Sequence, residues 1–227
     1  AAPDLRTRPP RRGGAMMAPV LRSAASLGLV AIAGTALLAG VHQLTAERIA
    51  AQERRAVLEQ LQEIIPADRY DNALQDDWIS FTDETHFPRG QQVLAYRARR
   101  DGQPVAVILR FAAVNGYNGP IHLLAGIETD GSLAGVRVTS HRETPGLGDA
   151  IEVARNDWIR SFDGRSLRSP GPQGWGVRRD GGEFDQFTGA TITPRAVVEA
   201  VRLALDYHAA NHQALFAAAA PAPKASP

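Results

Sequence analysis

The chain has 227 residues, and because 25 Lys and Arg residues nearly balance 24 Asp and Glu residues, its formal net charge is only +1. It lacks the basic excess of a dedicated nucleic-acid-binding protein, so we expect no nucleic acid partner, and its hydrophobic fraction of 44% is typical of a folded globular protein. The sequence has no cysteine, which excludes disulfides, thiolate nucleophiles and cysteine-held metal centres, so any redox chemistry needs another cofactor.

The first predicted element is a membrane span over residues 23–44, SAASLGLVAIAGTALLAGVHQL, which contains no Lys, Arg, Asp or Glu. As an α-helix this segment extends roughly 33 Å at about 1.5 Å per residue, enough to cross a hydrocarbon core of about 30 Å. A cleaved signal peptide is the alternative. We favour a retained anchor, because the apolar run exceeds the usual signal core of about 7 to 15 residues and no convincing A-x-A cleavage site closes it.

Positive charge precedes this span, and the flank that follows it has mixed charge. By the positive-inside rule, residues 1–22 are expected in the cytoplasm and the main domain in the periplasm, with one pass through the bilayer of a bacterial inner membrane. The arginines that carry this prediction are Arg6, Arg8, Arg11, Arg12 and Arg22.

A stalk helix is predicted over residues 45–66, where apolar residues recur at nearly helical spacing until Pro66. An α+β domain follows over residues 67–210. Within it, the pairs Asp101-Gly102, Asn115-Gly116 and Asp130-Gly131 separate β-rich runs, which predicts an antiparallel sheet rather than a parallel nucleotide-binding one.

After the sheet, the sequence predicts a helix over residues 149–162, a short strand at WGVRR and an amphipathic helix over residues 194–210. Residues 211–227 end in a low-complexity Ala/Pro-rich tail, which we expect to be unstructured.

The stretch DGGEFDQFTGATITPRAVV carries the strongest chemical signal. Thr193 is a suitable N-cap and Pro194 a suitable first residue for the helix that follows. Thr191 would then lie beside exposed helix N–H groups, and Gly189 lets the backbone approach a ligand closely, which favours a phosphate at this place. On these residues alone, a purely structural helix cap stays open as the alternative.

Two further segments are rich in turn residues: HRETPGLGDAIE after one predicted strand and GYNGP in a predicted hairpin loop. Pro145 and the glycines around it make a rigid turn, and taken alone both segments are also consistent with ordinary connections.

Together, DQFTGATIT, GYNGPI and HRETPGLGD resemble the FMN-binding domain family, and within it the G subunits of Rnf-type ion-translocating electron-transport complexes. The resemblance extends from about residue 91 to residue 207. In that family the last threonine of a D-x-x-[ST]-G-A-[ST] motif carries FMN through a phosphodiester bond, and the matching residue is Thr191. The other constrained motif positions are filled by Asp185, Thr188, Gly189 and Ala190.

The same resemblance implies that two other loops line the flavin site. The residues implied are Glu143, Thr144, Pro145, Gly146 and Leu147 in one loop, and Gly116 and Tyr117 in the other.

The resemblance also implies a role and partners. The chain would relay electrons in a complex that couples electron transfer between ferredoxin and NAD to Na⁺ or H⁺ movement. Its partners would be the other membrane, iron–sulfur and flavin subunits, and a separate flavin transferase would install the FMN from FAD. The chain would not turn over alone, and no catalytic residue is assigned to it.

Three alternatives stand beside this interpretation. The C subunit of the sodium-pumping NADH:quinone reductase is a relative, but the DGGEFDQ segment before TGAT favours the Rnf type. A membrane-anchored redox sensor would be expected to add an output domain or further spans. In a structural subunit with an empty site, the TGAT turn would only cap a helix.

Other chemistry finds little support. His208 and His212 stand four residues apart on one predicted helix, but no carboxylate partner is evident, so we predict no metal site. The sequence has no G-x-G-x-x-G or P-loop motif, which argues against NADH binding on this chain.

Overall fold

The structure, a computed structural model, describes residues 17–217. Residues 1–16 and 218–227 lie outside the described residues, and with them lie Arg6, Arg8, Arg11 and Arg12 and the end of the predicted tail. The chain divides into two units within its first helix, the first ending at Glu53 and the second beginning at Arg54.

A single helix, α1 (Met17–Gln62), contains both the predicted span and most of the predicted stalk. Within it, Val20–Ala46 has a mean hydropathy of 2.0 and is long and apolar enough to cross a membrane. Its large apolar side chains are exposed, as expected of a helix that presents them to lipid. The predicted boundary between span and stalk is therefore a change of composition and not a break in the helix.

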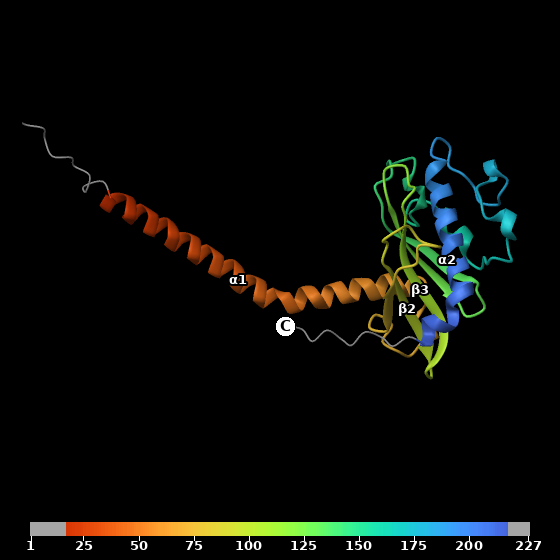
Figure 1. The fold of residues 1–227 in the computed structure, drawn as a ribbon, viewed down its shortest axis with the longest axis horizontal. Helices are drawn as coiled ribbons and strands as arrows, with labels where there is room; N and C mark the ends of the chain where they lie inside the picture. Colours follow the sequence, from red (N-terminus) through yellow and green to blue (C-terminus); the bar gives the residue numbers. More distant parts are fainter. Residues whose placement is uncertain (1–16, 218–227) are drawn as a thin grey trace, which may run out of the picture. The chain divides into compact units, whose positions relative to one another are not determined.

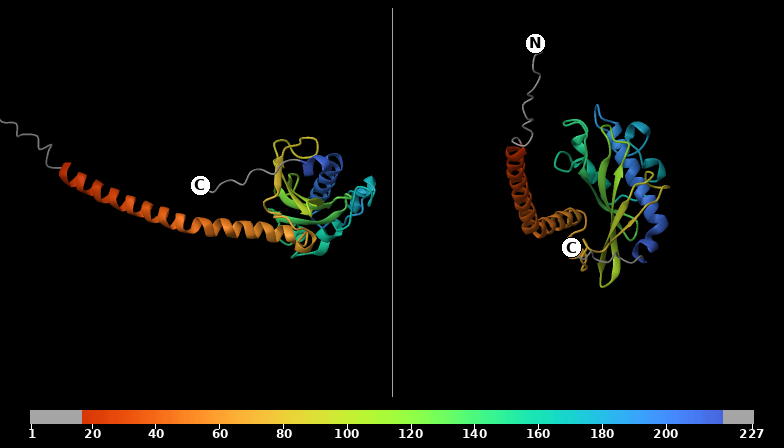
Figure 2. Two further views of the ribbon diagram at one scale, coloured as in Figure 1. Left: turned by 90° about the horizontal axis from the view of Figure 1, so that it is seen from below. Right: turned by 60° about the vertical axis from the view of Figure 1, so that its left-hand side comes forward.

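The second unit is built on a sheet that is antiparallel, as predicted, and that has five strands in the order of the sequence. Its strands are β1 (Trp78–Phe81), β2 (Val93–Arg100), β3 (Gln103–Ala113), β4 (Ile121–Glu128) and β5 (Leu133–Ser140). Figure 1 shows helix α2 (Ile192–Ala217) lying across one face of this sheet. The two views in Figure 2 show the segment between β5 and α2 beside α2.

Both faces of the central strands are buried, which explains the nearly continuous apolar run of β3. Side chains alternate between the faces of a strand, so Val107 and Leu109 join α2 in the larger core. Ala106 and Ile108 face a smaller core on the opposite side, which includes Leu61 near the end of α1. The sheet is thereby held between two apolar layers.

Several local predictions differ from the structure. The helix predicted over residues 149–162 is two short 3-10 helices, η2 (Asp149–Ile151) and η3 (Asp157–Phe162). Extended backbone at Glu152 and Asn156 separates them, and the Asn156 side chain accepts from the Trp158 N–H at 2.8 Å and caps the second. The strand predicted at WGVRR is reduced to a single bridge between Val177 and Phe184. Strand β1 was not predicted, and α2 continues to Ala217, seven residues beyond the predicted helix end.

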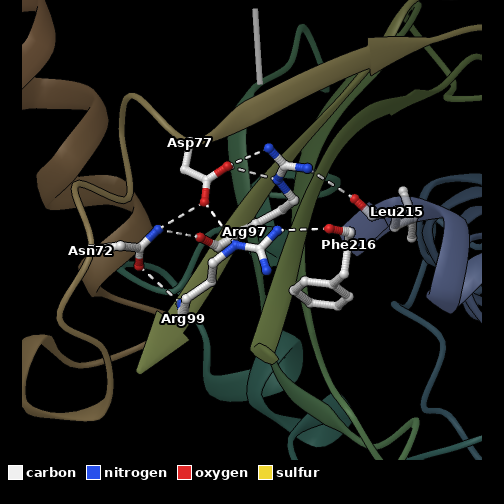
Figure 3. A network of polar contacts seen from close by, with 6 residues as sticks. All are labelled: Asn72, Asp77, Arg97, Arg99, Leu215 and Phe216. Carbon is white, nitrogen blue, oxygen red and sulfur yellow. Dashed lines mark hydrogen bonds and ion pairs between the residues drawn. The ribbon is translucent and has the colours of Figure 1, made fainter. Parts of the chain in front are cut away.

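Two arginines fix the C-terminal end of α2 to the sheet (Figure 3). Arg97, which is buried, donates from Nη1 to the Leu215 carbonyl at 3.2 Å, and Arg99 donates from Nη2 to the Phe216 carbonyl at 2.8 Å. Asp77 accepts from Nε of both arginines, at 2.7 and 3.0 Å. The last carbonyls of a helix lack intrahelical donors, and these contacts supply them. The positive charge of the two guanidinium groups also interacts favourably with the partial negative charge at the C-terminal end of the helix.

Candidate functional site

A cavity of about 330 Å³ lies at the N-terminal end of α2. Three segments that are distant in the sequence form it: the loop after β3, the turn after β5 and the TGAT segment. Its lining residues are Tyr117, Glu143, Thr144, Leu147, Gly148, Gly189, Ala190, Thr191, Ile192 and Thr193.

The structure thus brings seven of the twelve predicted cofactor residues around one cavity: Tyr117, Glu143, Thr144, Leu147, Gly189, Ala190 and Thr191. Five do not line it: Gly116, Pro145, Gly146, Asp185 and Thr188. Three lining residues, Gly148, Ile192 and Thr193, were not predicted to belong to the site. Of these, Thr193 was singled out in the sequence, but as a helix cap.

Thr191 immediately precedes the first residue of α2, and its carbonyl accepts a hydrogen bond from the Arg195 N–H at 3.3 Å. The predicted N-cap, Thr193, is instead the second helical residue, and Pro194 is the third, so the prediction placed the helix start two residues too late. Within the described part of the chain, no hydrogen bond engages the Thr191 hydroxyl. Thr191 itself lines the cavity.

The turn before Thr191 depends on glycine. Gly189 has φ of +81°, in the left-handed region that residues with a Cβ rarely adopt. The Ala190 N–H donates to the Phe187 carbonyl at 3.1 Å and closes the turn. Gly189 and Ala190 also present little bulk beside Thr191.

Glu143 is the buried acidic group of the site, with 4% of its surface exposed. Its Oε1 accepts from the Asn118 backbone N–H at 3.0 Å, and its Oε2 accepts from the Thr193 hydroxyl. A buried carboxylate without partners is strongly unfavourable, so these donors are essential to its placement. Glu143 consequently joins the loop after β3 to the start of α2.

Two glycines make room for Glu143. A Cβ built at Gly148 would lie 2.8 Å from the Glu143 Cβ, and one at Gly116 would lie 3.0 Å from Glu143 Oε1. Gly116 therefore packs closely against Glu143 and the Gly119 carbonyl, although it does not itself line the cavity.

The backbone of Glu143 is held by His141. The Glu143 N–H donates to His141 Nδ1 at 3.0 Å, so the opposite nitrogen, Nε2, carries the proton that faces Glu152 Oε1 at 2.6 Å. This pair lines a neighbouring cavity of about 650 Å³, which Glu143 and Pro145 also line.

The predicted motif residue Asp185 lies apart from the cavity. Its carboxylate pairs with Arg178 at 2.9 Å on the surface, and its carbonyl accepts from Trp158 Nε1 at 2.8 Å. In this structure Asp185 stabilises the segment that leads to TGAT.

The cavity fits a flavin mononucleotide on two grounds. The first N–H groups of a long helix lack intrahelical acceptors, so the start of α2 suits a phosphate. Around the opening, Tyr117, Leu147 and Ile192 are 65%, 46% and 44% exposed, although large apolar side chains are normally buried. Such an apolar rim suits the flat ring system of a flavin.

Comparison with known proteins agrees with this geometry. The FMN-binding domain family matches residues 116–206, a range that includes every residue lining the cavity, and the RnfG N-terminal region matches residues 16–64, which cover α1. The fold and the site thus define a flavin-binding domain of the FMN-binding family preceded by a helix able to span a membrane.

Its relatives identify the branch of this family. The G subunit of the ion-translocating oxidoreductase complex of Pseudomonas aeruginosa PAO1 is 48% identical over 198 residues, covering 87% of this chain and 92% of the relative. The G subunits from Pseudoalteromonas atlantica and Vibrio cholerae N16961 are 43% and 42% identical, covering 85% and 88% of this chain and 89% and 95% of the relatives. The chain belongs to the G subunits of Rnf-type ion-translocating oxidoreductase complexes, which confirms the resemblance predicted from its motifs.

Proposed function

We propose that this protein is an electron-carrying membrane subunit of an Rnf-type complex, in which FMN is bonded through its phosphate to the Thr191 hydroxyl. The complex would couple electron transfer between ferredoxin and NAD to ion translocation. The observation that carries the proposal is the Thr191 hydroxyl, which is without a hydrogen-bond partner among the described residues and opens on an apolar-rimmed cavity at a helix N-terminus.

The attachment step needs a flavin transferase and FAD. Thr191 Oγ1 attacks the phosphorus of the FMN half of FAD, a new P–O bond forms, the anhydride bond breaks, AMP leaves and the hydroxyl proton is released. The N–H groups at the start of α2 would stabilise the charge on the phosphate that remains. Thr191 thus serves as an anchor, and no residue of this chain is required as a catalyst.

Bound FMN supplies reversible electron uptake and release, which the side chains of this chain lack. The chain's own residues set the surroundings of the ring: Tyr117, Leu147 and Ile192 provide apolar contact, and Glu143 holds the loops in place. Electrons would come from and go to iron–sulfur and flavin subunits of the complex, so the isolated chain is not expected to turn over.

The topology of the proposal is a single pass through the bacterial inner membrane, with the N-terminus cytoplasmic and the FMN domain periplasmic. Support comes from the apolar helix Val20–Ala46 and the arginines that precede it in the sequence. Protease added to intact spheroplasts should digest the domain of a C-terminally tagged chain. Protection of the domain there, with digestion only in inverted vesicles, would reverse the assignment.

Covalent attachment is tested by producing the full chain together with an active flavin transferase. The denatured wild-type chain should give a fluorescent band in an SDS gel, and Thr191→Ala should be dark. Thr139→Ala is the matched control, because Thr139 lines the neighbouring cavity and not the one that Thr191 lines, and it should fluoresce like wild type. A dark wild-type band beside an active transferase would leave the TGAT turn with only a structural role.

A further inference from the structure

We propose that Thr193 and Glu143 are the positioning residues for flavin attachment, because their hydrogen bond sets the orientation of the first turn of α2 and so of the Thr191 hydroxyl. This inference rests on the proposed attachment of FMN at Thr191. In this proposal Glu143 holds the first turn of α2 in place, and Thr193 orients that turn through its hydrogen bond and does not act as a helix cap.

The geometry of Thr193 carries the first step. Thr193 is fully buried, stands two residues after Thr191, and donates its hydroxyl hydrogen to Glu143 Oε2. Because Thr193 is the second residue of α2, no preceding helical turn offers a carbonyl to its hydroxyl. The hydroxyl instead binds a group 50 residues earlier in the sequence. The bond therefore restrains rotation of the first turn of α2 about its axis.

The other side of the carboxylate is equally restrained. Glu143 Oε1 accepts from the Asn118 N–H at 3.0 Å, and the Asn118 side chain donates from Nδ2 to Thr144 Oγ1 at 3.1 Å. One carboxylate thus connects the three segments that form the cavity: the loop after β3, the turn after β5 and the start of α2.

The packing leaves Glu143 little freedom to adopt another arrangement. A Cβ at Gly148 would lie within 3.1 Å of both Glu143 and Thr193, so the backbone closes over their contact. The Glu143 N–H is bound to His141 Nδ1 at 3.0 Å, which fixes the backbone from which the side chain extends. Loss of the Thr193 hydrogen bond is consequently not compensated by a new partner at short range.

Phosphoryl transfer to a hydroxyl requires its oxygen to be aligned with the phosphorus, and a displacement of about 1 Å lowers the rate on the order of a hundredfold. Since Thr191 has no side-chain hydrogen bond among the described residues, the helix start that follows it is the main restraint on its position. A loosened first turn should therefore slow attachment even when the domain remains folded.

The first test measures attachment to the full chain in detergent, with purified flavin transferase and FAD, by in-gel fluorescence and intact mass. Thr193→Val has nearly the shape of threonine but lacks the donor, and we expect about ten- to a hundredfold slower attachment. Thr193→Ser keeps the hydroxyl and should recover most of the rate. The control is Thr139→Val, the same change at a hydroxyl that has no hydrogen-bond partner within residues 17–217, and it should attach at the wild-type rate.

The second test separates position from charge at Glu143. Glutamine can accept from the Asn118 N–H through its oxygen and donate to Thr193 through its amide nitrogen. Glu143→Gln should therefore recover most of the attachment that Glu143→Ala loses. If Glu143 instead acted as a base through its negative charge, Glu143→Gln would be as slow as Glu143→Ala.

Because the defect lies in the acceptor protein, Thr193→Val should lower the kcat of the transferase and leave its KM for FAD unchanged. Amide hydrogen exchange at Asn118 should also be faster in folded Thr193→Val than in wild type. The Asn118 N–H donates to the Glu143 carboxylate, and that carboxylate loses its hydrogen bond from Thr193 in the variant.

The outcomes distinguish this inference from the function on which it rests. A wild-type chain that accepts no flavin contradicts the proposed attachment itself. A wild-type chain that accepts flavin, with Thr193→Val equally fast or Glu143→Gln as slow as Glu143→Ala, overturns the positioning role. If Thr193→Val fails to fold, the comparison of Thr193→Ser and Glu143→Gln with wild type decides, and slow attachment in both folded variants counts against the role.

Discussion

Gly148 offers a direct steric test of the site. Its backbone conformation is one that any residue can adopt, so only contacts with neighbouring atoms disfavour a side chain there. Its φ of −88° and ψ of −17° suit any residue, so substitution adds no backbone strain. A Cβ there would lie 2.8 Å from the Glu143 Cβ, 3.0 Å from its Oε2 and 3.1 Å from the Thr193 Oγ1. Since overpacking a buried site costs about 1–3 kcal/mol, Gly148→Ala should destabilise the domain by that amount.

At about 2–4 °C per kcal/mol for a domain of this size, Gly148→Ala should lower the Tm by about 2–12 °C. The assay is thermal unfolding followed by tryptophan fluorescence, because Trp78, Trp158 and Trp175 all lie in the second unit. Gly171→Ala is the control, since Gly171 has φ of −63° and a Cβ added there would meet no atom within 4 Å. It should change stability by less than about 1 kcal/mol. Equal Tm values for Gly148→Ala and wild type would refute the packing argument.

Three other parts of the domain are open to similar tests. Asp77→Ala removes the carboxylate that faces buried Arg97, so it should destabilise the domain by about 3–5 kcal/mol in urea unfolding, and unchanged stability would contradict the network in Figure 3. Burial, with a smaller effect of His212, lowers the pKa of His208 to about 4; the unfolded chain therefore binds the proton more readily, and stability should fall as pH decreases from about 6.5 toward 4. His208→Gln should flatten that part of the pH profile, and an unchanged slope would contradict the assignment. Gly189→Ala forces a Cβ into φ of +81°, so it should slow flavin attachment, as measured by in-gel fluorescence, while a wild-type rate would show that the turn tolerates the strain.

The sheet was predictable because its turns carry local signals. Asp101 and Gly102 both have positive φ, 50° and 73°, as a tight turn between paired strands requires, and Gly131 has φ of 85° in the turn between β4 and β5. The short strand β1 has no such signal on either side, and only its pairing with β2 defines it.

The cavity was predictable only as a set of motifs. TGAT and the turn after β5 could be located in the sequence, but the hydrogen bond between Thr193 and Glu143 joins residues 50 positions apart and depends on how α2 packs on the sheet. For the same reason, Gly116 could be recognised as a turn residue but not as the neighbour of a buried carboxylate. The start of α2 was misplaced because Thr191 and Thr193 are equally good caps by residue type, and tertiary hydrogen bonding decides between them.

The central claim, a phosphoester between FMN and Thr191, is tested most directly by tandem mass spectrometry of peptides from the chain purified from its own membrane. We predict that the peptide containing the TGAT segment carries the mass of FMN and that fragmentation assigns it to Thr191. An unmodified Thr191 in flavin-containing protein, with the flavin released on denaturation or bonded to Thr188, would contradict the claim.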